Sequence, residues 1–109
     1  MKIDYLLRYQ NTDTGSDKIW GIICLNPDKT FDPFESDRTF DYVTFWGKKG
    51  GRLQTKQWTG SQWEAQTLAK NKQHKKIGYL PVDRRRLTTE YSGLKEELER
   101  IVTWAVLTL

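Results

Sequence analysis

The hydrophobic pattern of this chain of 109 residues changes its period once, near residue 60, and that change limits the fold more than any other feature. Before it, residues 39–46 alternate, with Phe40, Tyr42, Thr44 and Trp46 on one side. After it, apolar residues recur at helical spacing. A period of two is typical of strands and a period near 3.6 of helices. The sequence therefore predicts a sheet built from the first half of the chain and helices built from the second.

Clusters of turn-forming residues divide the first half into strand-like runs. The runs are residues 3–9, 18–25, 39–46 and 52–58. Segment 11–17 is rich in Asn, Asp, Gly and Ser and is typical of a hairpin turn, and residues 26–38 are predicted as an acidic loop. A turn is also expected at residues 48–51, because its two glycines accept positive φ. An antiparallel arrangement of about four to five strands follows.

Two helices are predicted in the second half. Ser61 and Glu64 have the spacing of a capping box, and Gly78 is a suitable stop for that helix. Its narrow apolar stripe consists of Ala65, Leu68 and Ala69, continued by the aliphatic stems of Lys72 and Lys76.

The second predicted helix follows Gly93. Its apolar face comprises Leu94, Leu98, Ile101, Val102, Ala105 and Leu109. Glu96 and Arg100 are spaced for an ion pair along it, although the β-branched segment 101–109 also suits a strand. We therefore expect an α+β fold, an antiparallel sheet with one helix packed across it plus a C-terminal amphipathic helix. Residues 1–82 would form one domain, with 83–109 as a helical extension of the same globule.

Composition excludes several classes of protein. A single cysteine, Cys24, cannot form an intramolecular disulfide, and with the single His74 it cannot build a structural zinc site. No apolar run has the length of a leader or a membrane span. We expect a reduced, cytoplasmic protein that has no cofactor and does not contact a membrane.

Catalytic motifs are not found in the sequence. It contains no glycine-rich phosphate loop, no HExxH and no nucleophile with a plausible histidine partner. A metal-dependent nuclease would need convergent carboxylates, for which the candidates are Asp28, Asp32, Glu35, Asp37 and Asp41. Turn formation beside Pro27 and Pro33 explains these residues more simply. We therefore predict neither catalysis nor a metal site.

Basic side chains gather in the middle of the chain. Residues 46–86 hold 11 Lys and Arg but only 2 Asp and Glu, whereas the net charge of the whole chain is +4. Because Coulomb attraction sums over a local patch, such a block suits phosphate or another polyanion. For the helical lysines alone, a solvated helix face is the simpler interpretation. The complete block, which includes residues 84–86, favours a polyanion.

Aromatic residues accompany this basic block. Trp46 ends a predicted strand, Trp58 and Trp63 flank a helix start, and Tyr79 follows the helix. Aromatic rings beside cations suit nucleic acid, because bases offer flat faces for stacking. Packing in the core is the alternative role for a tryptophan at a strand end.

A chain of spaced features in this block resembles a known family, the WGR domain of poly(ADP-ribose) polymerases and bacterial proteins. The features are Trp46-Gly47-Lys48, Gln54-Thr55-Lys56, Ser61-Gln62-Trp63-Glu64-Ala65 and Lys75-Lys76-Ile77-Gly78-Tyr79, over roughly residues 1–82. The resemblance implies an antiparallel sheet crossed by a helix, and DNA binding through the motif Trp and Arg. Lys48 stands at the Arg position, where it keeps the charge but loses the planar fork of guanidinium.

The resulting hypothesis is a non-catalytic module that binds nucleic acid, DNA rather than RNA, mainly through phosphates. The predicted binding residues are Trp46, Gly47, Lys48, Lys49, Arg52, Lys56, Lys72, Lys75 and Lys76. Trp46 and Arg52 are expected to be neighbours beside the turn. The C-terminal helix would cover the sheet or pair two copies of the chain. The alternative function is a protein-interaction module, such as a phage or plasmid accessory protein, that docks an acidic partner.

Overall fold

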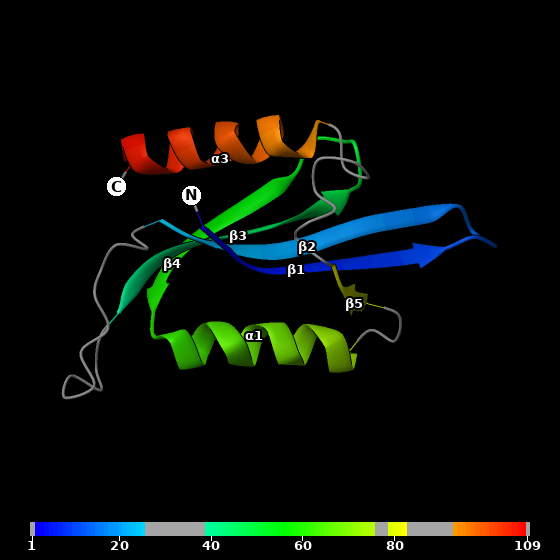
Figure 1. The fold of residues 1–109 in the computed structure, drawn as a ribbon, viewed down its shortest axis with the longest axis horizontal. Coiled ribbons are helices and arrows are strands. Elements are labelled where there is room, and N and C mark those ends of the chain that lie inside the picture. The colour runs from blue at the N-terminus through cyan, green and yellow to red at the C-terminus, as the bar shows by residue number, and fades with distance from the viewer. Residues whose placement is uncertain (1, 26–38, 76–78, 83–92, 109) are drawn as a thin grey trace.

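Five strands form one antiparallel sheet with a helix on each face. The computed structural model describes residues 2–25, 39–75, 79–82 and 93–108. The elements are β1 (Lys2–Asn11), β2 (Ser16–Cys24), β3 (Phe40–Lys48), β4 (Gln54–Gly60), α1 (Gln62–Lys75), β5 (Tyr79–Pro81) and α3 (Leu94–Thr108). The strands lie in the order β4-β3-β2-β1-β5. Figure 1 shows the sheet between α1 and α3, so the predicted α+β class is confirmed.

The central strand β2 is buried on both of its faces. Residues from Ile19 to Cys24 are all buried, because β2 lies between β1 and β3 and is covered by both helices. A side chain such as Ile22, with no exposed surface, contributes about 1.5–3 kcal/mol to folding by leaving water. The apolar run in the sequence thus reflects a strand with two covered faces rather than one.

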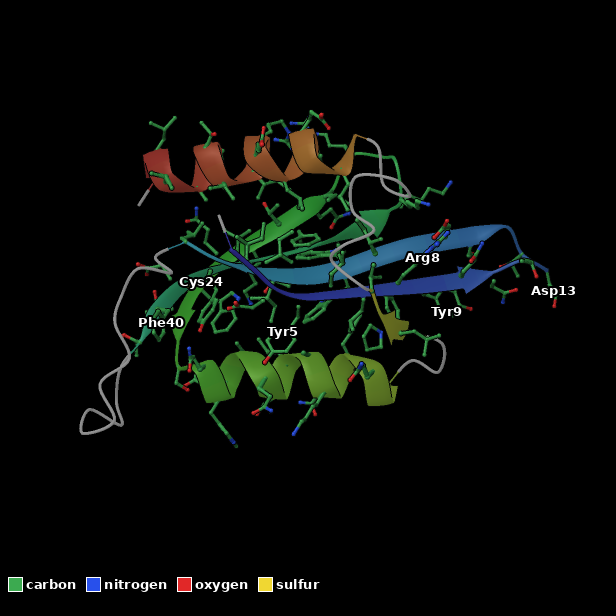
Figure 2. The ribbon with its side chains drawn as sticks, viewed as in Figure 1. Tyr5, Arg8, Tyr9, Asp13, Cys24 and Phe40 are labelled. Carbon is green, nitrogen blue, oxygen red and sulfur yellow. The ribbon has the colours of Figure 1, made fainter. Side chains whose placement is uncertain are left out.

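Strand alternation sorts the core into two clusters. The cluster under α3 contains Ile3, Leu6, Ile19, Ile23, Val43, Phe45, Leu53, Leu94, Leu98, Ile101 and Ala105. The cluster under α1 contains Leu7, Trp20, Ile22, Cys24, Phe40, Tyr42, Ala65, Ala69 and Tyr79. Figure 2 shows the same alternation in β1, where Tyr5 and Tyr9 lie on the α1 side and Arg8 on the other.

Helix α1 begins where the capping pattern predicted. The hydroxyl Oγ of Ser61 accepts the backbone N–H of Glu64 at 3.2 Å, and the Ser61 carbonyl accepts that of Ala65 at 3.2 Å. Ala65 and Ala69 are buried, whereas Leu68 is 42% exposed. Small residues on this stripe let the helix lie close to the sheet, and only a narrow face of it is covered. The predicted stop at Gly78 lies outside the described residues.

Helix α3 covers the second face of the sheet. Its residues Leu94, Leu98, Ile101 and Ala105 are buried in the core, so segment 101–108 is helical and not a strand. Its apolar face is thus used within the chain. The predicted pairing of Arg100 with Glu96 is wrong in detail.

Arg100 instead pairs with Glu97, one residue nearer along the helix. Its guanidinium contacts both carboxylate oxygens of Glu97, at 2.6 and 3.1 Å. The same carboxylate accepts the backbone N–H of Leu53 at 3.2 Å, which ties the β3–β4 connection to α3. The hydrogen bonds from Arg100 and Leu53 lower the pKa of Glu97.

The hairpin of β1 and β2 carries a second ion pair. The guanidinium of Arg8 donates to both carboxylate oxygens of Asp17, at 2.9 and 2.8 Å. This bidentate contact with Arg8 lowers the pKa of Asp17. The turn predicted for residues 11–17 is observed: β1 ends at Asn11 and β2 begins at Ser16.

Two details of the sheet differ from the sequence-based expectation. Strand β4 runs from Gln54 to Gly60, two residues later than predicted, because Leu53 is drawn into the core under α3. Residues 79–81, which are not among the predicted strand-like runs, form the short edge strand β5 against β1. The predicted loop at 26–38 lies outside the described residues.

Candidate functional site

A pocket opens on the α1 side of the sheet, between β2, β3, β4 and the helix. Its volume is about 490 Å³. The residues that line it are Trp20, Thr44, Trp46, Lys56, Trp58, Leu68 and Lys72. Three of these seven side chains are indoles and two are lysines, so the pocket combines flat apolar walls with positive charge.

Strand register explains how these residues meet. Trp20 of β2 lies directly opposite Trp46 of β3, and Thr44 lies opposite Lys56 of β4. Directly opposed residues in an antiparallel pair share a face. Side chains two positions apart on one strand also share a face, which adds Trp58 to the set.

The indole of Trp58 is held by two contacts. Its Nε1–H donates to the hydroxyl of Thr44 at 2.7 Å. Its ring stacks on that of Tyr42, with centroids 4.6 Å apart and an angle of 25° between the planes. Tyr42 is almost fully buried, and burial raises the pKa of its phenol well above the usual range, so the ring stays neutral. The wall formed by Trp58 is therefore fixed before any ligand arrives.

Lys72 reaches the pocket from the third turn of α1. Its ammonium lies 5.2 Å from the centroid of the Tyr79 ring, at cation–π distance. Tyr79 in turn packs against Tyr9, with ring centroids 5.5 Å apart. Burial raises the pKa of Tyr79, so this ring presents a neutral π face to the lysine at pH 7. Lys72 thus lines the pocket while its ammonium lies over Tyr79, a ring outside the lining of the pocket.

Positive charge extends beyond the pocket along the same face. Lys18 of β2 lies directly opposite Lys48 of β3, two residues from the pair of Trp20 and Trp46. Both lysines are exposed. Like charges at directly opposed positions destabilise a sheet, and an anion between them removes that repulsion. No carboxylate is among the described residues that line the pocket.

The structure divides the predicted site residues into two groups. Trp46, Lys56 and Lys72 line the pocket, and Lys48 lies beside it on the same face. Lys75 is the last residue of α1, and Lys76 lies outside the described residues.

Gly47, Lys49 and Arg52 have other surroundings. Gly47 has φ of 149°, a conformation that glycine adopts most easily. The backbone N–H of Lys49 donates to the Asp17 carbonyl at 2.9 Å, which joins the β3–β4 turn to β2.

Arg52 lies away from the pocket. It lines a separate hollow with Leu53, Glu97 and Arg100 beside α3. The expectation that Arg52 is the neighbour of Trp46 is therefore wrong, because the longer turn brings Gln54 opposite Trp46.

Four pocket residues were absent from the predicted binding set. They are Trp20, Thr44, Trp58 and Leu68. Trp58 was recognised only as an aromatic residue near a helix start. The alternation in β3 placed Thr44 with Trp46, but Trp20 and Lys18 join the site only through the register of β2 on β3. Trp63, also considered, is 70% exposed and does not line this pocket.

The described residues contain no group of three or more His, Cys, Asp and Glu side chains that could hold a metal ion. Asp41 accepts a hydrogen bond from the Thr59 hydroxyl at 2.9 Å. The other carboxylates considered for a nuclease site, at 28–37, lie outside the described residues. None of the helices in the described part of the chain is long and apolar enough to cross a membrane.

The pocket suits a flat molecule that carries negative charge. Indole faces attract planar rings through stacking, and lysines attract anionic groups. The fold and the pocket define a small α+β protein whose sheet carries a pocket lined by three indoles and two lysines. Comparisons of the chain with protein-family models, curated proteins and solved structures give no match.

Proposed function

We propose that the chain is a non-catalytic module that binds nucleic acid, DNA in preference to RNA, through phosphate contacts and an aromatic platform. The observation that carries this proposal is the pocket where Trp46 meets Lys56 and Lys72. Nucleotides combine a planar ring with an anionic group, and the pocket offers a surface for each.

The distribution of charge supports phosphate contacts. Lys18 and Lys48 continue the positive surface from the pocket along β2 and β3. A nucleic-acid strand carries a phosphate at every nucleotide, so several lysines on one face can be engaged together. Lys56 is exposed and Lys72 half-buried, which leaves the Lys56 ammonium open to solvent and a strand.

The resemblance to the WGR domain supports the same proposal. The motif residues Trp46, Gly47 and Lys48 lie at the end of β3, at the pocket and beside it. An antiparallel sheet crossed by a helix is also the architecture that the resemblance implies. That this chain belongs to the WGR family is likewise proposed.

Salt dependence of duplex binding tests the proposal. With a fluorescent random-sequence duplex, we expect log affinity to fall with log salt at a slope of about −5 if about six phosphates are engaged. An acidic protein partner would compete for the site and would give a much smaller slope. A slope near zero, or no binding at low salt, would contradict phosphate recognition.

Lysine variants assign the binding to the pocket. Lys56→Gln and Lys72→Gln should each weaken binding to all sequences and reduce the size of the slope by about one. Lys70→Gln is the matched control, because Lys70 is an exposed lysine of α1 outside the pocket. Equal effects of all three variants would attribute the binding to net charge rather than to this site.

A further inference from the structure

The shape of the pocket bears on whether a nucleotide bound in it is paired in a duplex or unpaired. In a duplex, each base is covered on both faces by its neighbours, and its edge is occupied by its partner. A base can meet the walls of a pocket only after it has left the stack. The pocket of this protein has three indoles around a volume of about 490 Å³, within the range of small-molecule sites.

We propose that this pocket takes a single unpaired nucleotide, with its base between the indoles and a phosphate at Lys56 and Lys72. This inference rests on the proposed function and adds the state of the ligand. A flat platform would suit the end of a duplex, whereas this pocket is lined from β2, β3, β4 and α1, so a group in it meets both the sheet and the helix.

The side chains that form the pocket walls are held in place before a ligand binds. Trp58 is fixed by its hydrogen bond to Thr44 and by stacking on Tyr42. Trp20 is buried and therefore held by the core, and Trp46 is half-buried at its side. Little side-chain freedom is lost when a ring enters, so stacking is not offset by the cost of ordering the walls.

Thr44 gives the pocket a polar group. Its hydroxyl oxygen accepts the hydrogen bond from Trp58, and the hydroxyl hydrogen can still be donated. Base carbonyl groups accept such a hydrogen bond once the base is unpaired. Thr44 is 9% exposed and lines the pocket, so a base that reaches it must lie inside the pocket.

Lys56 and Lys72 both line the pocket, so a phosphate there would meet their side chains. Lys56 comes from β4 and Lys72 from α1, so they approach from the sheet and from the helix. Lys18 and Lys48 are positioned for the phosphate of an adjacent nucleotide along the strand. A nucleoside without phosphate should consequently bind more weakly than the corresponding nucleotide.

The experiment compares three fluorescent DNA probes at one salt concentration. They are a fully paired duplex, the same duplex with one unpaired thymidine, and a short oligothymidylate. We expect the unpaired thymidine to raise affinity about 5- to 150-fold over the paired duplex, the range of one base stacked on an aromatic side chain. The oligothymidylate should compete with the bulged duplex.

Leu68→Glu tests whether the gain comes from the pocket. Leu68 is 42% exposed, so the substitution adds a carboxylate at the pocket without removing a core residue. It should abolish the preference for the unpaired probe. Gln66→Glu is the matched control, since Gln66 is an exposed residue of the same helix outside this pocket and should keep the preference.

The outcomes separate this inference from the proposed function. Equal affinity for paired and unpaired probes, with the salt slope of duplex binding intact, would overturn the inference and leave the proposed function standing. A preference that Leu68→Glu leaves unchanged would also overturn it. Binding of none of the three probes would overturn both.

Discussion

Gly47 has a backbone conformation that disfavours any other residue. Its φ of 149° lies in the region that residues with a Cβ rarely adopt. A Cβ here would also lie 3.3 Å from Cδ2 of Leu53, which is packed under α3. Glycine at this position lets β3 keep Trp46 at the pocket while the following turn closes on the other face.

Gly47→Ala should therefore destabilise the protein by about 1–3 kcal/mol, the usual cost of a strained backbone conformation. Urea unfolding followed by circular dichroism measures this change. Gly51→Ala is the control, because the nearest atoms to a Cβ there are 3.5 Å away, an ordinary contact. Its effect should stay within about 0.5 kcal/mol. Equal losses for both variants would show that the conformation of Gly47 is not special.

Individual site residues were predictable where strand alternation decides their face. Alternation placed Thr44 and Trp46 together, and helical spacing placed Lys72 on the stripe that faces the sheet. Arg52 was misplaced because the length of a turn depends on tertiary contacts. Burial of Leu53 and its N–H donated to Glu97, 44 positions away, lengthen the turn. No local pattern contains that contact.

At the scale of elements, the two helices use their faces differently. Helix α3 buries four apolar side chains in the core, three of them large, whereas α1 buries chiefly the small side chains of Ala65 and Ala69. A helix that covers the sheet with alanines leaves room beside it. The pocket occupies that room, next to Leu68 and Lys72.

Leu98→Ala should test the role of α3 in the core. Leu98 is 1% exposed, and its truncation should lower the free energy of unfolding by about 2–5 kcal/mol through lost burial and a cavity. Leu107→Ala makes the same change at a residue of α3 that is 81% exposed, and should alter stability by less than about 0.5 kcal/mol. Thermal or urea unfolding compares the two. Similar stability of both variants would mean that α3 does not hold the sheet.

Whether a segment forms a helix or a strand was easier to predict from the sequence than which strands pair with each other. The change of period at residue 60, the capping pattern at Ser61 and the apolar face of α3 each reflect local chemistry, and each is observed. Strand β5 was not anticipated, because its three residues are held by pairing with β1. The pair of Lys18 and Lys48 depends in the same way on register, which forms between distant segments.

At the scale of the molecule, the sheet presents unlike surfaces to its two helices. The α3 side is an apolar core with a separate hollow beside Arg52 and Arg100, and the β3–β4 connection is tied to it through Glu97. The α1 side holds the aromatic cluster, the pocket and the lysines.

The five tryptophans allow the site to be tested in one spectrum. Trp20, Trp46 and Trp58 line the pocket, Trp63 lies exposed on α1, and Trp104 lies on α3. Each indole N–H gives its own resonance in a ¹H–¹⁵N spectrum of labelled protein. Titration with an oligonucleotide then reports on all five positions together.

This titration shows whether nucleic acid binds at the pocket or elsewhere on the protein. If the pocket binds nucleic acid, the indole resonances of Trp20, Trp46 and Trp58 should shift with the oligonucleotide in a saturable, salt-sensitive way. Those of Trp63 and Trp104 should stay in place. Shifts confined to Trp63 and Trp104, with the three pocket resonances unmoved, would contradict the account.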